Sequence, residues 1–261
     1  MTRDTASAEA SVLVSREGPV LVVTINRPAM RNAIDRAASE SIARAMDELD
    51  ADPALTIGIL TGAGGHFCAG MDLKAFLRGE RVELDGRGLA GIVETPPRKP
   101  LIAAVEGYAL AGGCEIALAC DLLVAADNAQ FGIPEVKRGL IAGSGGLIRL
   151  PQRIPRQIAM EYALTGALMP ASEARQWGLV NRLTRPGEAL DGARALASTI
   201  AANGPMAVRM TKRVMTEAPG WAAGEVWQRQ RELLEQVIAS NDAREGALAF
   251  SEKRAPRWSG S

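Results

Sequence analysis

Apolar residues recur along this chain in two rhythms, one typical of strands and the other of amphipathic helices. Ser11–Ile25 is apolar and β-branched and is broken by Glu-Gly-Pro at 17–19, which predicts a two-stranded hairpin. Ala37–Asp50 carries apolar residues at helical spacing, and Thr56–Thr61 follows as a short strand. The order of strand and helix returns in four segments, roughly 11–50, 56–95, 101–121 and 122–160. This rhythm predicts a stacked α/β core of repeated units.

From Pro155 onward the strand signals fade, and 179–183 is the one short strand that the pattern still predicts. Helical spacing dominates instead, and the predicted helices span 158–164, 172–177, 190–202, 205–217, 221–240 and 242–253. We therefore expect a loose N-terminal arm at 1–10, a core domain at 11–200 and a C-terminal helical region at 201–261. The helical region is expected to cover the core or to pack on a neighbouring subunit.

The stretch Leu101–Asp121 has the pattern of a site that presents backbone amides. An apolar run of strand length leads into a turn with the pair Gly112-Gly113, and an alanine-rich helix follows. A helix that starts after glycines offers free N–H groups and lets a ligand approach the backbone. Glu115 falls in the first helical turn, where it serves either as a helix-capping carboxylate or as an acid/base group. A second carboxylate, Glu135, follows 20 residues later in the sequence FGIPEVKRGL.

The glycine-rich loop Gly62–Leu73 is a second candidate source of backbone amides, with Met71 as the candidate donor. It lacks both the ending of a P-loop and the spacing of a dinucleotide-binding loop, and the alternative is a plain strand-to-helix turn. If amides from both loops converge on a carbonyl oxygen, they stabilise an enolate. Glu115 and Glu135 then supply acid/base chemistry, so that water activation and proton transfer become possible.

Composition restricts the function further. Hydrophobic residues make up 47% of the chain and charged residues 23%, and the formal net charge is zero, which gives no support for nucleic acid as a partner. The three cysteines and the single histidine argue against a disulfide framework, a zinc site or a multi-histidine metal centre. A nucleophile pair of His66 and Cys68 and a Mg²⁺ ion held by carboxylates are the remaining alternatives. We expect neither a cysteine nucleophile nor a metal.

No signal peptide is visible, and residues 1–10 are short, polar and rich in alanine. The apolar segment 101–126 contains Glu106, Glu115 and Asp121, and acidic residues are costly at the centre of a bilayer. We therefore expect a cytoplasmic protein with no membrane span.

Five blocks of sequence resemble the enoyl-CoA hydratase/isomerase (crotonase) superfamily, and the resemblance runs from about Val12 to Trp258. The blocks are INRPAMRNAID (25–35), TGAGGHFCAGMDL (61–73), VEGYALAGGCEIALACDLLVAAD (105–127), AQFGIPEVKRGL (129–140) and FSEKRAPRW (250–258). The resemblance implies a crotonase-like ββα spiral core with a C-terminal helical trimerisation region. It also implies a homotrimer or a dimer of trimers.

The resemblance also implies roles for individual residues. The oxyanion hole is expected from the backbone N–H groups of Met71 and Gly112, and the acid/base pair from Glu115 and Glu135. Glu115 would position and deprotonate water, and Glu135 would exchange the α-proton. The residues implied in binding coenzyme A or substrate are Met30, Ala69, Asp72, Leu73, Lys74, Phe250 and Lys253. Coenzyme A enters as part of an acyl-CoA thioester substrate, and no separate cofactor is expected.

The expected function is therefore addition of water to a 2-trans-enoyl-CoA, which gives a 3-hydroxyacyl-CoA. Alternatives are a specialised acyl-CoA dehydratase, an enoyl-CoA isomerase or lyase, and a non-catalytic acyl-CoA-binding relative. Departures from the family pattern bear on the acyl group: the block GGTQRL becomes GGLIRL at 145–150, Ala142 replaces a proline, and Met71 replaces a smaller alanine.

Overall fold

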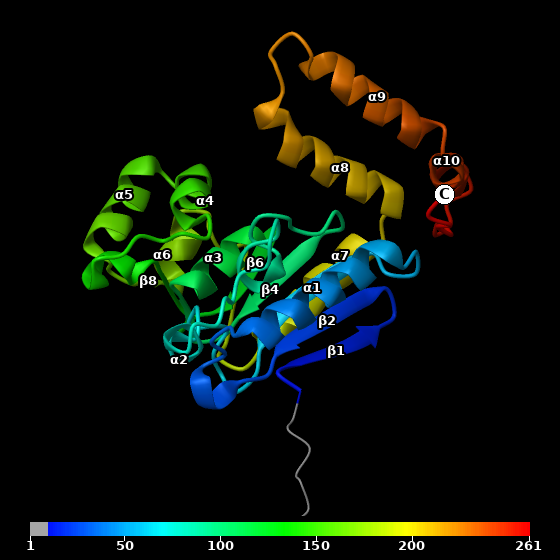
Figure 1. The fold of residues 1–261 in the computed structure, drawn as a ribbon. Coiled ribbons are helices and arrows are strands. Elements are labelled where there is room, and N and C mark those ends of the chain that lie inside the picture. The colour runs from blue at the N-terminus through cyan, green and yellow to red at the C-terminus, as the bar shows by residue number, and fades with distance from the viewer. Residues whose placement is uncertain (1–9) are drawn as a thin grey trace, which may run out of the picture.

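The computed structural model describes residues 10–261, and its core is built on two sheets (Figure 1). The larger sheet has the strand order β1-β2-β3-β4-β6-β9, and all neighbours except β1 and β2 run parallel. Its strands are β1 (Val12–Glu17), β2 (Val20–Ile25), β3 (Ile57–Gly62), β4 (Leu101–Val105), β6 (Leu122–Ala126) and β9 (Arg182–Thr184). The smaller sheet has the order β5-β7-β8, formed by β5 (Tyr108–Leu110), β7 (Gln130–Gly132) and β8 (Met169–Pro170).

Helices follow the strands in the order that the sequence pattern predicts. The α-helices are α1 (Arg36–Ala51), α2 (Leu73–Leu77), α3 (Gly112–Ala119), α4 (Gly146–Arg153), α5 (Arg156–Thr165), α6 (Ala171–Gln176), α7 (Ala189–Ala201), α8 (Pro205–Glu217), α9 (Val226–Ile238) and α10 (Asn241–Ser251). Short 3₁₀ turns are η1 (Pro28–Met30), η2 (Leu89–Gly91), η3 (Pro134–Arg138) and η4 (Ala218–Gly220). The expected α/β class with C-terminal helices is confirmed.

The central strands of the larger sheet, β2, β3, β4 and β6, are largely buried on both faces, as parallel strands usually are, whereas the edge strands β1 and β9 are mostly exposed. Along β2, Leu21 and Val23 join the main core with α1, while Val20 and Val22 belong to a second cluster on the other face. That second face is covered by α7, whose buried alanines recur every four residues and allow the helix to lie close to the strands. The alanines are Ala189, Ala193 and Ala197. The sheet is therefore a rigid base for the loops at its ends.

Helix α3 is the most deeply buried helix of the core, and all eight of its residues are buried. It follows β5, a strand that the sequence pattern did not predict because it is only three residues long. The main-chain N–H of Ala111, just before α3, donates to the carbonyl of Gly132 at 2.8 Å. This bond fixes the start of α3 on the smaller sheet.

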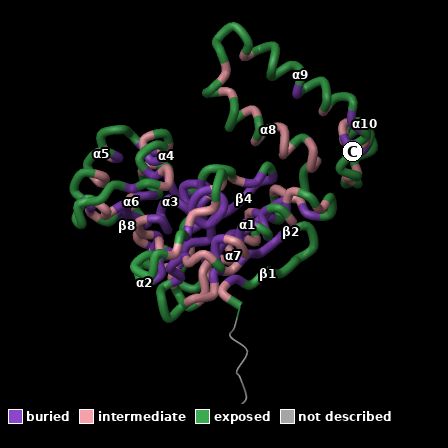
Figure 2. Tube along the Cα trace, viewed as in Figure 1, coloured by how far each residue is buried: buried purple, intermediate pink, exposed green. Residues whose placement is uncertain are grey.

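Helices α8 to α10 project away from the sheets, and Figure 2 shows them mostly exposed. No residue of α8 is buried, and α9 buries only Leu233. The Lys212 side chain ties α8 to the core through an ion pair with Asp121 at 2.6 Å. The predicted helix 221–240 begins later, at Val226, because residues after Trp221 form a turn. Except for residue 10, the predicted N-terminal arm lies outside the described residues.

Candidate active site

The first part of the site is the loop that carries the amide of Met71. Ile34 donates its N–H to the carbonyl of Gly70 and accepts from the N–H of Asp72, both at 2.8 Å. These two bonds form a single parallel bridge between Ile34 and Met71. In such a bridge the N–H of Met71 points away from Ile34, so it remains directed toward the other side of the loop.

The amide of Gly112 lies beside this loop, at the first position of α3. A β-carbon added at Gly112 would lie 3.5 Å from the nitrogen of Met71, and one added at Gly70 would lie 3.0 Å from the nitrogen of Gly112. The preceding residue, Ala111, has φ +51° and ψ −128°, a conformation that costs an alanine of order 1–3 kcal/mol. The backbone is thus held in a strained turn that places the Met71 and Gly112 nitrogens side by side.

Glu115 is held in the first turn of α3 with only 2% of its surface exposed. Its Oε1 accepts the N–H of Ser144 at 2.7 Å and the N–H of Gly146 at 2.9 Å. Burial raises the pKa of Glu115, and the nearby Glu135 raises it further, while the two amides oppose the rise. One carboxylate oxygen is therefore anchored by backbone donors, and Oε2 is left for other partners.

Glu135 lies in η3, close enough to Glu115 for its charge to raise the pKa of that carboxyl. Its Oε2 is buried and has no hydrogen-bond partner among residues 10–261. Burial raises the pKa of Glu135 above its ordinary value, although Arg138 opposes the rise. A buried carboxylate oxygen without a partner is costly in a purely structural role, and it is a common feature of functional sites.

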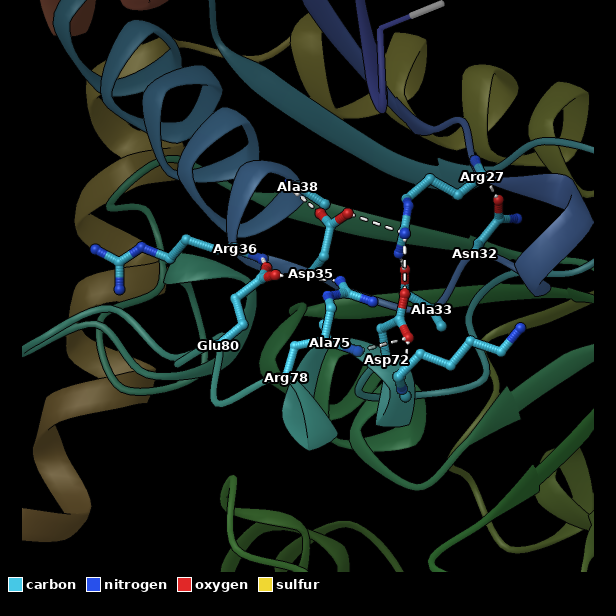
Figure 3. Close-up of polar contacts among 12 residues, drawn as sticks. Arg27, Asn32, Ala33, Asp35, Arg36, Ala38, Asp72, Ala75, Arg78 and Glu80 are labelled. Atoms are coloured by element: carbon cyan, nitrogen blue, oxygen red, sulfur yellow. Dashed lines mark hydrogen bonds and ion pairs between the residues drawn. The ribbon is translucent and has the colours of Figure 1, made fainter. Parts of the chain in front are cut away.

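Asp72 uses its side chain within the protein. Its Oδ1 accepts the N–H groups of Lys74 at 2.9 Å and Ala75 at 3.2 Å, which caps α2. Its Oδ2 pairs with Arg27 at 2.9 Å (Figure 3). Burial pushes the pKa of Asp72 up, but Arg27 and the two amides outweigh it, so the pKa lies below the ordinary value. The predicted role of Asp72 in ligand binding stays a prediction.

The other residues predicted to bind coenzyme A fall into two groups. The first group lies around the glycine-rich loop and α2. In it, Met30, Leu73 and Lys74 are exposed, and the N–H of Ala69 donates to the carbonyl of Arg31 at 3.0 Å. Phe250 is 87% exposed on α10, and Lys253 follows that helix. In Figure 1, α10 lies with the projecting C-terminal helices, on the opposite side of the view from α2. One chain does not bring the two groups together.

The alternative of a cysteine nucleophile is wrong. Cys68 is completely buried, and burial raises the pKa of its thiol to about 12, so the thiolate is not available. The His66 ring instead stacks on Tyr108, with ring centroids 4.7 Å apart, and its Nδ1 accepts the N–H of Tyr108 at 3.3 Å. In residues 10–261 no group of three or more histidines, cysteines or carboxylates is placed to hold a metal ion.

Sequence reasoning missed the groups that hold the site together. The glycines at 143–146 predicted a helix start, and α4 does begin at Gly146, but its amides were not expected to bind Glu115. Arg27 and Asn32, inside the block at 25–35, hold the Met71 loop: Arg27 binds the side chain of Asp72, and Asn32 donates to the carbonyl of His66. Nothing in a single sequence marks these two residues as supporting groups, because a polar residue in a turn is usually solvated.

Known proteins resemble this chain over nearly its full length. The family model for enoyl-CoA hydratase/isomerase matches residues 15–261. A crystal structure of an enoyl-CoA hydratase from Mycobacterium tuberculosis H37Rv is 60% identical, with TM-score 0.96, over 97% of this chain and 100% of that chain. The chain belongs to the enoyl-CoA hydratase/isomerase family.

Other relatives differ in their named reactions. Carnitinyl-CoA dehydratase of Proteus mirabilis (strain HI4320) is 41% identical over 96% of this chain and 98% of its own length. Enoyl-CoA hydratase EchA19 of Mycobacterium tuberculosis is 41% identical over 97% and 98%. Membership of the family confirms the expected crotonase fold and an enzyme of the hydratase or dehydratase type. None of the helices within 10–261 has the length and apolar character needed to cross a membrane.

Proposed function

We propose that this enzyme adds water across the 2,3 double bond of a 2-trans-enoyl-CoA thioester and so forms a 3-hydroxyacyl-CoA. The observation that carries the proposal is the combination of two adjacent amides, at Met71 and Gly112, with two carboxyl groups, on buried Glu115 and half-buried Glu135, that are close enough for the charge of Glu135 to raise the pKa of Glu115. A family member that only isomerises or binds a thioester has no need for both carboxylates.

The two amides would receive the thioester oxygen as negative charge develops on it. Their N–H groups are fixed by the fold before substrate arrives, so no reorganisation is needed in the transition state. Removing one such donor typically costs about 2.7–4 kcal/mol of transition-state stabilisation. Polarisation of the carbonyl makes C3 open to attack and makes the C2 hydrogen more acidic.

The two carboxylates would divide the proton transfers. Glu115, anchored through Oε1, would accept a proton from water with Oε2 while the water oxygen bonds to C3. Glu135 would deliver a proton to C2 of the enolate, and its raised pKa favours the protonated form that can do so. A proton passed from Glu115 back to Glu135 would close the cycle. Because the two groups interact, their protons titrate as a pair.

Coenzyme A would lie along the glycine-rich loop and the start of α2, where the ammonium group of Lys74 suits a phosphate. Because Phe250 and Lys253 lie far from that loop in one chain, we propose that a second copy of the chain supplies them. A trimer, or a dimer of trimers, would bring the projecting helices onto a neighbour. In support, a groove of about 310 Å³ between α8 and α9 is lined mostly by apolar side chains, among them Met210, Val214 and Leu234.

Dehydration of a specialised 3-hydroxyacyl-CoA is the second candidate function, and it is favoured by the resemblance to carnitinyl-CoA dehydratases. The chemistry is the reverse of hydration, and the same amides and carboxylates would serve it. Only the pocket for the acyl group would differ. The departures from the family pattern that bear on this pocket are Met71 and the block GGLIRL at 145–150.

A panel of thioesters tests both candidates. Crotonyl-CoA, longer and branched enoyl-CoAs, and 3-hydroxyacyl-CoAs with and without a trimethylammonium group are each incubated with the enzyme, and absorbance of the conjugated double bond is followed. Hydration of simple enoyl-CoAs supports the first candidate. Activity limited to the trimethylammonium substrates supports the second, and binding without turnover across the panel would refute both.

A further inference from the structure

We propose that Arg27 is a positioning residue that sets the direction of the Met71 N–H in the oxyanion hole. This inference rests on the proposed function of the two amides. The hydrogen bonds and ion pairs of the Arg27 side chain involve neither amide nitrogen. It would therefore act through Asp72, which follows Met71, and through the residues on both sides of Ile34. Figure 3 shows its guanidinium group between Asp35 and Asp72.

The partners of Arg27 lie on both sides of Ile34 and directly after Met71, the two members of the bridge. Its guanidinium group donates to the carbonyl of Ala33, one residue before Ile34, and pairs with Asp35, one residue after, at 2.9 Å. It also pairs with Asp72, directly after Met71, at 2.9 Å. A planar guanidinium can make these contacts at once, whereas a lysine ammonium offers a single point charge.

The two aspartates are also the starts of two helices. Asp35 accepts the N–H of Ala38 at 2.8 Å and caps α1, and Asp72 caps α2. Each carboxylate is therefore fixed at one end to a helix and at the other to Arg27. The arginine ties the beginning of α1, which lies on the sheet, to the beginning of α2, which follows the Met71 amide.

The charge of Arg27 offsets the repulsion between the carboxylates of Asp35 and Asp72. The Oδ2 atoms of Asp35 and Asp72 each lie 2.9 Å from the same nitrogen of Arg27, so they can be no more than 5.8 Å apart. Side-chain exposure is 19% for Asp35 and 6% for Asp72, so water screens the pair poorly. Without the guanidinium, the two charges would push Asp72 away and turn the adjoining Met71 amide with it.

Asn32 holds the other end of the same loop. Its Oδ1 accepts the N–H of Arg27 at 2.9 Å, and its Nδ2 donates to the carbonyls of Ala63 at 2.8 Å and His66 at 2.6 Å. The glycine loop is thereby fixed at its beginning by Asn32 and at its end by Arg27. Removal of Arg27, unlike removal of Asn32, leaves the negative charges of Asp35 and Asp72 without their partner.

The test compares Arg27→Met and Arg27→Lys with Arg16→Met. Arg16 is the matched control, because it also joins two carboxylates, Glu48 at 2.6 Å and Asp52 at 2.7 Å, but lies at the sheet edge away from the site. Turnover of crotonyl-CoA is measured together with the absorbance of bound dimethylaminocinnamoyl-CoA, whose spectrum shifts to longer wavelength when its carbonyl is polarised.

We expect Arg27→Met to lower kcat about 10- to 100-fold, as a displaced catalytic group does, with little change in KM and a smaller spectral shift. Arg27→Lys should recover part of both losses, and Arg16→Met should match wild type. Wild-type kcat and a full spectral shift in Arg27→Met would overturn the inference.

Two further results keep the outcome clear. If Arg27→Met does not fold, Arg27→Gln replaces it, because its amide keeps a hydrogen-bond donor while the positive charge between Asp35 and Asp72 is gone; a full spectral shift there would also overturn the inference. A wild-type enzyme that shifts no probe and turns over no enoyl-CoA would refute the proposed function itself. A wild type that does both, beside an unaffected Arg27→Met, would refute only the role of Arg27.

Discussion

The two sides of the candidate site are built in different ways. On the amide side, the Met71 and Gly112 nitrogens belong to backbone that is held by a β-bridge, a strained turn and the Arg27 network. On the carboxylate side, Glu115 is anchored through one oxygen only, and Glu135 has a buried oxygen without a partner within residues 10–261.

This difference separates what the fold requires from what the reaction requires. Every residue except proline keeps its backbone N–H, so the amide side persists wherever the loops fold. Side-chain carboxylates can be replaced singly without loss of the fold. A family that shares the amide side could therefore change its reaction by changing the carboxylate side.

The largest effect should come from the carboxylate side. Glu115→Gln and Glu135→Gln should each lower kcat for an enoyl-CoA by about 10²–10⁴-fold, because each removes one acid/base group. Binding of the thioester should persist, since the amides remain. Steady-state kinetics and calorimetric titration with a saturated acyl-CoA measure the two quantities. Full turnover in either variant would disprove the role given to that residue.

The next effect concerns the stability of the amide side. A β-carbon at Gly113 would run into the carbonyl oxygen of Cys68, which is backbone and cannot turn away. We expect Gly113→Ala to destabilise the protein by about 3 kcal/mol, measured by chemical denaturation. Gly143→Ala on the carboxylate side is the matched control, because a β-carbon there meets nothing within 4 Å. Its effect on the free energy of unfolding should stay within about 0.5 kcal/mol. Equal effects of the two substitutions would contradict the claim that the amide side is the more tightly packed.

The smallest effect is a gain of stability on the carboxylate side. The folded-state pKa of Glu135 is raised, so its protonated form favours folding at low pH, and this contribution is lost as pH rises through the folded pKa. Glu135→Gln should therefore raise Tm near neutral pH by about 2–4 °C, equivalent to roughly 1 kcal/mol, and the gain should shrink toward pH 4.

Glu245 supplies a control of opposite sign for this measurement. The hydrogen bond from Arg254, with the N–H of Arg257, lowers the pKa of Glu245 to about 2. Its contribution to stability is present above the ordinary glutamate pKa and is lost as pH falls toward 2. Glu245→Gln should lower Tm at neutral pH. If Glu135→Gln also lowers Tm, the Glu135 carboxylate stabilises the fold, which would contradict the cost assigned to its buried oxygen without a partner.

Much of this architecture could be predicted from the sequence because its signals are local. The hairpin at 11–25 and the helix at 37–50 follow from periodicity and turn residues, and β1, β2 and α1 confirm them. The three-residue strand β5 could not be predicted, since so short a run has no measurable period. Its place depends on pairing with β7, a contact between residues far apart in sequence.

The same reasoning explains what was found and missed in the site. Glu115 and the glycines before it share one segment, so a strand, turn and helix start could be recognised together. The amides that hold Glu115 come from Ser144 and Gly146, about 30 residues away, and nothing local marks that contact. The tail residues Phe250 and Lys253 were assigned by resemblance, and their distance from α2 became visible only in three dimensions.

Isotope labelling of the product tests the central claim most directly. Crotonyl-CoA is incubated with the enzyme in water labelled with heavy oxygen and deuterium, and the product is analysed by mass spectrometry and NMR. Two amides acting with two carboxylates predict a 3-hydroxybutyryl-CoA with one labelled oxygen at C3 and one deuterium at C2. Movement of the double bond with deuterium at another carbon and no labelled oxygen would contradict the account, because it would mean isomerisation without hydration.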